Sequence, residues 1–104
     1  MGNESGGEWQ GTRRRLDAPQ PIWVRLAQAL PPQRRMGYGN APLRVRAGGI
    51  NITTTVPGVL LAWHQTCFGD WWALATFELT SRNGRASLVV TQPVPAGAVA
   101  PRDP

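Results

Sequence analysis

The chain has 104 residues and a formal charge of +5 at pH 7, and all eleven of its basic side chains are arginines. This length suits one domain and excludes two well-packed ones, and the single cysteine, Cys67, excludes an internal disulfide. No apolar stretch approaches the ~20 residues needed to cross a bilayer, so we expect a cytoplasmic protein without a membrane partner.

The chain begins with a segment that is poor in large apolar side chains. We expect residues 1–21 to form a flexible N-terminal arm. The first run of β-forming residues spans 22–27 and indicates a strand. A helix capped by Asp17 is the alternative. We favour the strand because Pro31 and Pro32 end the run without a C-cap glycine.

The next segments predict a loop followed by a hairpin. Residues 33–42 carry two glycines around a tyrosine and read as a long loop, a feature that is more often functional than a short connection. Residues 43–47 alternate between apolar and arginine side chains, which predicts a strand. Gly48 and Gly49 then predict a two-residue turn, and the Thr-rich run 50–56 is the expected partner strand.

The middle of the chain predicts the centre of a sheet. Pro57 and Gly58 read as a turn or a sharp bend. Residues 59–64 are apolar on both faces, as expected of a central strand. A loop over 66–70 separates them from 71–80, the longest strand candidate, which has one fully apolar face.

The strongest local signal is the Asn83-Gly84 pair between two extended runs. It predicts a type I′ hairpin, because that turn needs positive φ at both central residues. Residues 86–92 are the return strand, and a 3₁₀ turn is expected in 93–99. The chain thus predicts five or six strands linked mostly by hairpins, and a meander of this size hides its edges by curling into a small barrel.

Three stretches also carry a family resemblance: 56–63 (VPGVLLAW), 71–77 (WWALATF) and 94–101, which opens with VPA. Together they resemble the strand signature of small uncharacterised SH3-like barrel proteins from high-GC bacteria. The resemblance covers about half of the chain and implies an all-β, SH3-like barrel. Together with the strands expected from the sequence, it leads us to expect this barrel over 22–100 and a C-terminal tail at 101–104. It implies a fold and not a reaction, since one fold hosts many functions.

Catalytic residue types are scarce. His64 and Cys67 have the spacing His-x-x-Cys, but the sequence holds no second pair to complete a zinc site. A Cys–His nucleophile would also need a third group to orient it. Asp70 and Glu78 form no recognisable acid pair, and no Gly-rich phosphate loop is present. We therefore expect no catalytic residue, no metal and no cofactor, and a protein that is not an enzyme.

The positive charge favours an anionic partner, nucleic acid first, although arginine-rich, lysine-free sequences are also typical of GC-rich genomes. On a strand, Arg44 and Arg46 would share one face, and Arg25 would join them if the first strand were adjacent. Guanidinium groups bind phosphate through paired hydrogen bonds, and an aromatic ring stacks on unpaired bases. The candidate nucleic-acid-binding residues are Arg25, Arg34, Arg35, Tyr38, Arg44 and Arg46.

Five tryptophans are many for this length. Trp63 and Trp71 are expected in the core, while Trp23 and Trp72 are candidates for exposed partner-binding anchors. We therefore expect a non-catalytic binding module for an anionic partner such as nucleic acid. The alternative is a protein-interaction or structural accessory domain that uses an exposed tryptophan. The oligomeric state is left open.

Overall fold

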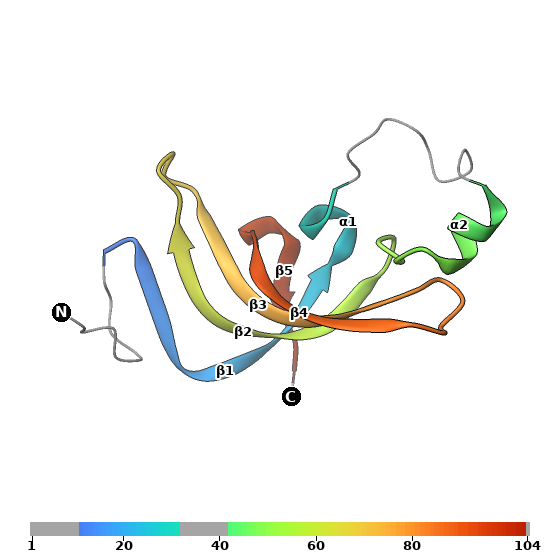
Figure 1. Cartoon of the computed structure of the whole chain (residues 1–104). Coiled ribbons are helices and arrows are strands. Elements are labelled where there is room, and N and C mark those ends of the chain that lie inside the picture. Colours follow the sequence, from blue (N-terminus) through green and yellow to red (C-terminus); the bar gives the residue numbers. More distant parts are fainter. Residues whose placement is uncertain (1–10, 32–41, 104) are drawn as a thin grey trace.

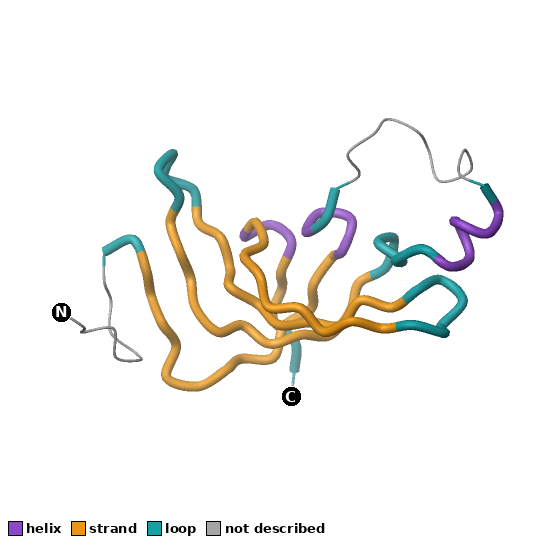
Figure 2. The backbone as a smooth tube through the Cα atoms, viewed as in Figure 1, coloured by secondary structure: helices purple, strands orange, loops and turns teal. Residues whose placement is uncertain are grey.

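One curled antiparallel sheet dominates the computed structural model, which describes residues 11–31 and 42–103 (Figures 1 and 2). Its strand order is β4-β3-β2-β1-β5, and the sheet curves through about half of a barrel. The all-β fold predicted from the sequence is therefore confirmed. The described elements are β1 (Arg13–Arg25), α1 (Leu26–Ala29), α2 (Leu43–Gly48), β2 (Thr55–Gln65), β3 (Trp71–Thr80), β4 (Ser87–Pro95), the 3₁₀ turn η2 (Ala96–Ala98) and β5 (Val99–Pro101).

The hydrophobic core lies on one face of the sheet, which we call the core face. Alternate residues of β1 and β3 point into it, as the period of two in a strand requires. Helix α1 and the turn η2 cover the core face and add Leu26, Ala29 and Ala98. The other buried core residues are Ile22, Val24, Leu60, Ala73, Ala75, Phe77, Leu79 and Val94. We call the opposite side of the sheet the outer face.

Several strand predictions are confirmed. The strand predicted over 71–80 is β3, with the expected bounds. The run 59–64 lies inside β2, which pairs with β1 on one side and β3 on the other. The loop predicted over 66–70 joins these strands and is closed by a backbone hydrogen bond from Thr66 N to Asp70 O of 2.9 Å.

The β3–β4 connection lies where the Asn-Gly pair predicts it, but its turn type differs. A type I′ turn needs positive φ at Asn83, and only glycines have positive φ among the described residues. Asn83 Oδ1 accepts hydrogen bonds from Ser81 Oγ (2.7 Å) and Arg85 N (3.0 Å), which hold a wider loop in place. Within the β3–β4 connection, only Gly84 takes the left-handed conformation, at φ 76°.

The first strand starts earlier than predicted. β1 begins at Arg13 and not at Ile22, so residues 13–21 belong to the sheet although the sequence assigned them to an N-terminal arm. This part of β1 pairs with the last residues of β2, and Gln65 N donates a 2.7 Å hydrogen bond to Thr12 O. Pairing with β2 satisfies backbone N–H and C=O groups of this segment, so the segment forms a strand although its polar sequence does not predict one.

The residue that follows β5, Arg102, is hydrogen-bonded to the sheet. Arg102 N donates to Pro21 O at 3.2 Å, and the Arg102 guanidinium donates to Ile22 O at 3.0 Å and to Gly58 O at 3.1 Å. These bonds tie the residue after β5 to β1 and β2. Arg102 therefore belongs to the folded unit, although the sequence placed it in the tail at 101–104.

The strand predicted over 43–47 is wrong, because these residues form helix α2. Pro42 O accepts hydrogen bonds from Val45 N (3.0 Å) and Arg46 N (2.9 Å), and Val45 O accepts one from Gly49 N (2.8 Å). Leu, Arg and Ala are good helix formers, so the alternation was not a strand signal here. The predicted Gly48-Gly49 hairpin is consequently absent, and Leu43 of α2 is 76% exposed.

The partner strand predicted over 50–56 is also mostly wrong. Only its last residues enter β2, while Ile50 forms an isolated bridge with Ser81. Asn51 Oδ1 accepts a 3.0 Å hydrogen bond from Thr53 N, a local turn that competes with strand pairing. The predicted turn at Pro57-Gly58 is instead continuous strand.

Gly58 is needed for close packing and not for a turn. A Cβ at this position would lie 2.7 Å from Thr76 O and 3.2 Å from both Phe77 Cβ and Val24 Cγ2. We expect Gly58→Ala to lower the free energy of unfolding by about 1–3 kcal/mol through overpacking. Urea denaturation measures this, with Gly48→Ala as the control because nothing lies within 4 Å of its added Cβ. Equal stability of both variants would contradict the packing role.

Candidate functional site

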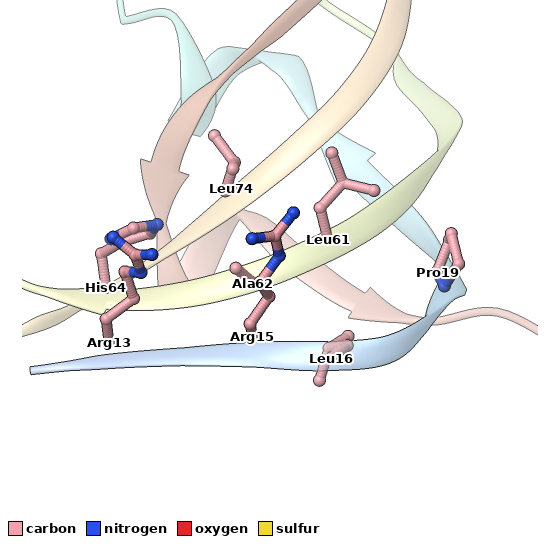
Figure 3. A pocket seen from close by; sticks show the side chains of 8 residues that line it. All are labelled: Arg13, Arg15, Leu16, Pro19, Leu61, Ala62, His64 and Leu74. Atoms are coloured by element: carbon pink, nitrogen blue, oxygen red, sulfur yellow. The ribbon is translucent and has the colours of Figure 1, made fainter. Parts of the chain in front are cut away.

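A hollow on the outer face forms where β1 and β2 lose their regular pairing. Arg15 pairs with Ala62 and Gln20 with Leu60, so residues 16–19 of β1 stand opposite the single residue Leu61. Such an insertion bends a strand and disrupts its ladder. The bulge leaves a cavity of about 420 Å³ between the two strands (Figure 3).

The walls of this cavity combine cationic and apolar groups. Arg13, Arg15 and His64 supply the nitrogen atoms, and in Figure 3 the side chains of Arg13 and His64 lie beside each other. The described lining residues include no acidic side chain. The apolar lining residues are Leu16, Pro19, Leu61, Ala62 and Leu74.

Strand register explains why these side chains meet. Arg13 pairs with His64 and Arg15 with Ala62, so all four project from the same face of the sheet. Arg14, between the two arginines, points to the core face and lines a different hollow with Trp63. The alternation of β1 thus separates three consecutive arginines into two on the outer face and one on the core face.

A second, shallower hollow adjoins the first. It shares His64 and Leu74 with it and adds Trp72 and Pro93 among its lining residues. These residues come from three neighbouring strands, because His64 pairs with Trp72, and Leu74 pairs with Pro93. We call the two hollows together the outer-face site. It carries cationic groups at the β1 end and an aromatic ring farther along the sheet.

The Trp72 ring is held in position by the loop before β3. Its indole Nε1 donates a 2.9 Å hydrogen bond to Asp70 Oδ2, and Thr66 Oγ1 donates to Asp70 Oδ1. The hydrogen bonds from Thr66 and then Trp72 lower the pKa of Asp70 from its ordinary value. Asp70 therefore stays a carboxylate at neutral pH and fixes the orientation of the indole.

His64 is predominantly neutral at pH 7. Partial burial, and then the charge of Arg13, lower its pKa from the ordinary value of 6.5. Because the unfolded chain binds this proton more readily, the folded state loses stability as the pH falls through 6.5 toward the folded pKa. A bound anion would offset the repulsion from Arg13 and favour the protonated imidazole.

We therefore expect the melting temperature to fall between pH 7.5 and pH 5.5, and His64→Gln to reduce that fall. Thermal unfolding followed by circular dichroism at both pH values measures the difference between the variant and the parent. Identical pH dependence in the two proteins would show that His64 does not carry this coupling.

The structure does not assemble the predicted nucleic-acid-binding residues on one sheet face. Arg44 and Arg46 lie on α2, where residues two apart are turned by about 200° around the helix axis and cannot share a face as on a strand. Arg25, at the end of β1, donates a 2.9 Å hydrogen bond to Gly97 O. Arg34, Arg35 and Tyr38 lie outside the described residues.

Other basic residues gather far from the outer-face site. Arg46 lines a hollow of about 270 Å³ with Arg82 and Asn83, between α2 and the β3–β4 loop. Backbone hydrogen bonds from Arg82 N to Gly49 O (3.0 Å) and from Asn83 N to Ala47 O (2.8 Å) hold this loop against α2. Figure 1 places α2 and this loop at the end of the sheet opposite the start of β1.

The two tryptophans predicted as anchors occupy different surroundings. Trp23 is 42% exposed, and the guanidinium carbon of Arg102 lies 5.6 Å from its ring centroid, a cation–π distance. Trp72 is half-buried in the outer-face site. Trp63 packs partly buried against the core, as expected, and Trp71 is half-buried.

Cys67 is an exposed free thiol on the loop between β2 and β3. In the described part of the chain, no group of three or more His, Cys, Asp or Glu side chains is placed to hold a metal ion. The pair His64 and Cys67 therefore contributes only one residue, His64, to the site.

Arg13 and Arg15 are the site residues that the sequence reasoning missed. They were assigned to the arm because the segment has few apolar residues. The sequence gives no signal for this extension, because Pro19 and Pro21 read as breaks in an extended run. Extending the first strand toward the N-terminus would have placed Arg13 and Arg15 on the same face, two residues apart.

Comparison with protein-family models, with curated proteins and with solved structures gives no match for this chain. Across 11–31 and 42–103, no helix is both long enough and apolar enough to span a membrane.

Proposed function

We propose that the protein is a non-catalytic binding module for an anionic partner, and that this partner is single-stranded nucleic acid bound across the outer face. The observation that supports the proposal is the outer-face site itself. Two arginines and a histidine line an apolar hollow there, and Trp72 lies next to it on the same face.

The arginines supply the phosphate contacts. Arg13 and Arg15 lie about 7 Å apart along β1, since alternate residues of a strand are separated by twice its rise. That spacing lets each guanidinium contact a separate phosphate group through paired hydrogen bonds. His64, beside Arg13, adds a charge when it is protonated.

The rest of the site suits unpaired bases. The Trp72 indole offers a flat aromatic surface, Pro93 adds an apolar ring to the same hollow, and Leu74 lines both hollows. Stacking of one base on an aromatic side chain contributes about 1–3 kcal/mol and tolerates any sequence. A duplex keeps its bases stacked within the helix, so an aromatic platform favours a single strand.

The proposal is tested by titrating the full chain into fluorescent oligo-dT and into a duplex of the same length. We expect tighter binding to the single strand, with a log–log salt slope of about −1.4 for two neutralised phosphates. Dissociation constants of about 10⁻⁴–10⁻⁶ M are typical of sequence-independent binding. Absence of binding at low salt, or equal affinity for the duplex, would refute the proposal.

We also propose that the half-barrel belongs to the SH3-like class. Three features support this assignment: five antiparallel strands, a long connection between β1 and β2, and a 3₁₀ turn before a short last strand that pairs with β1. The fold assignment does not by itself specify a partner.

The alternative is a protein-interaction module. Its support is the exposure of two aromatic side chains, Trp23 at 42% and Phe68 at 94%. Exposed aromatic anchors are typical of protein interfaces. Oligo-dT binding that weakens with added salt and with substitution of Arg13 would favour nucleic acid as the partner. Absence of oligo-dT binding would favour a protein partner bound through Trp23 and Phe68.

A further inference from the structure

The free edge of β4 is a distinct surface, independent of the proposed function. β4 ends the sheet and pairs with β3 alone in the part of the chain that the structure describes. Its sequence, SLVVTQPVP, contains no charged residue. Edge strands of monomeric proteins usually carry a charge or another device that blocks pairing, and Ser87 to Thr91 carries none.

The two prolines of β4 indicate which backbone groups face outward. Pro93 pairs with Leu74 and Pro95 with Trp72 within the β3–β4 ladder. Proline has no N–H, so within a ladder it occupies positions whose nitrogen points away from the neighbouring strand. Every second residue of β4, counted from Pro93, shares this orientation. The N–H and C=O groups of Ser87, Val89 and Thr91 therefore point toward the open edge.

The side chains beside this edge are also open to solvent. Leu88 is 54% exposed and Val89 is 65% exposed, on opposite faces of the sheet. Val90 is half-buried, and Ser87 and Thr91 are exposed. A strand added at this edge would cover apolar surface on both faces as well as satisfying the backbone groups.

We propose that this edge pairs with the same edge of a second copy of the chain, forming an antiparallel β4–β4 dimer centred on Val89. A twofold axis perpendicular to the sheet keeps each face continuous across the two copies. Val89 then lies opposite Val89 of the second copy, Leu88 opposite its Val90, and Ser87 opposite its Thr91. Each pair joins residues of similar character, so the strand is complementary to itself.

Charge does not oppose this pairing. Arg85 precedes β4, so the two copies carry it at opposite ends of the dimer ladder, where four residues of paired strand already separate one Ser87 from the other by about 14 Å. Glu78, which pairs with Val89, lies about 14 Å from its equivalent, three strand spacings away. Both separations exceed the Debye length of about 8 Å at physiological salt, so the repulsion is screened.

The expected dimer is weak. Pairing is limited to the residues before Pro93, so the interface is smaller than the roughly 1,000 Å² of stable complexes. We therefore expect a monomer–dimer equilibrium that depends on protein concentration. The same surface could also accept an extended segment of an unrelated protein, and the experiment below separates that case from self-association.

Sedimentation velocity of the full chain over a wide concentration range tests the proposal. We expect the average mass to rise from one chain toward two as concentration increases. Val89→Lys places two ammonium groups next to each other on the axis and should weaken the dimer about fivefold. Leu43→Lys makes the same change in charge on exposed α2 and should leave the dimer intact.

A second variant distinguishes loss of the dimer from loss of the fold. Thr91 lies two residues before Pro93, so proline at this position should leave the β3–β4 backbone ladder intact, although the 2.8 Å hydrogen bond between the Thr76 and Thr91 hydroxyls is lost. The variant removes one outward N–H at each end of the dimer ladder. We expect it to weaken the dimer without changing the circular dichroism spectrum. A parent protein that stays monomeric at every concentration, or a dimer that is unaffected by Val89→Lys and Thr91→Pro, would overturn the proposal.

Discussion

Replacing Phe77 by alanine is expected to lower the free energy of unfolding by about 3–5 kcal/mol, the largest effect of any single substitution considered for this chain. Phe77 is 3% exposed and lies at the centre of the core face. It pairs with Gly58 on one side and Val90 on the other, so the deletion leaves a cavity between three strands. Small domains lie toward the low end of total stabilities of about 5–15 kcal/mol, so the variant should lose a large fraction of its stability.

Urea denaturation followed by tryptophan fluorescence measures this loss. Phe68→Ala is the matched control, because it removes the same side chain from a position that is 94% exposed. The control should remain within about 0.5 kcal/mol of the parent protein. A similar effect of both substitutions would contradict the assignment of the core to this face of the sheet.

Replacing Arg13 and Arg15 together by glutamine is expected to remove most of the affinity for oligo-dT. Each charge-assisted contact contributes about 1.5–3 kcal/mol, so loss of one arginine should weaken binding at least tenfold. The salt slope should fall from about −1.4 toward zero, since fewer phosphates are neutralised. Fluorescence anisotropy titrations at several salt concentrations measure both quantities.

The matched control changes the same number of charges elsewhere. Arg44→Gln with Arg46→Gln alters α2 at the other end of the sheet and lowers the net charge equally. We expect it to change the affinity by less than the Arg13 and Arg15 pair. If both double variants lost affinity to the same extent, the interaction would depend on net charge and not on the outer-face site.

Periodicity predicted the fold best where both neighbouring strands were present. From Ala73 onward, the run 71–80 alternates between buried residues and residues that are half-buried or exposed, because β2 and β4 flank it and one face packs on the core. The same rule failed at 43–47, where alternation arose in a helix whose apolar residues are exposed. Alternation alone does not show that a neighbouring strand exists. Here Pro42 O accepts hydrogen bonds from Val45 N and Arg46 N, and the segment is a helix.

Gly58 and Arg13 illustrate what a single sequence leaves undetermined. A Pro-Gly pair normally indicates a turn, but Gly58 lies in β2 because its neighbours leave no room for a Cβ. That requirement depends on Phe77 and Val24, which are distant in sequence. Arg13 was placed in the arm for a similar reason, since its pairing with His64 depends on the register of β2.

The candidate site was predictable only in its chemistry. Arginine and tryptophan side chains were expected at the site, but Trp72, predicted to be exposed, is half-buried in the outer-face site. The cavity beside it depends on the bulge at 16–19, which arises from the register shift between β1 and β2. No local pattern records such a shift, so the sequence pointed to Arg44 and Arg46 instead of Arg13 and Arg15.

The most direct measurement is a two-dimensional NMR titration of the ¹⁵N-labelled full chain with oligo-dT. If the outer face binds the strand, the guanidinium Nε–H signals of Arg13 and Arg15, the indole signal of Trp72 and the ring signals of His64 should shift together and saturate at one stoichiometry. Shifts confined to Arg44, Arg46, Arg82 and Arg85, or no shifts at low salt, would contradict the placement of the binding site on the outer face.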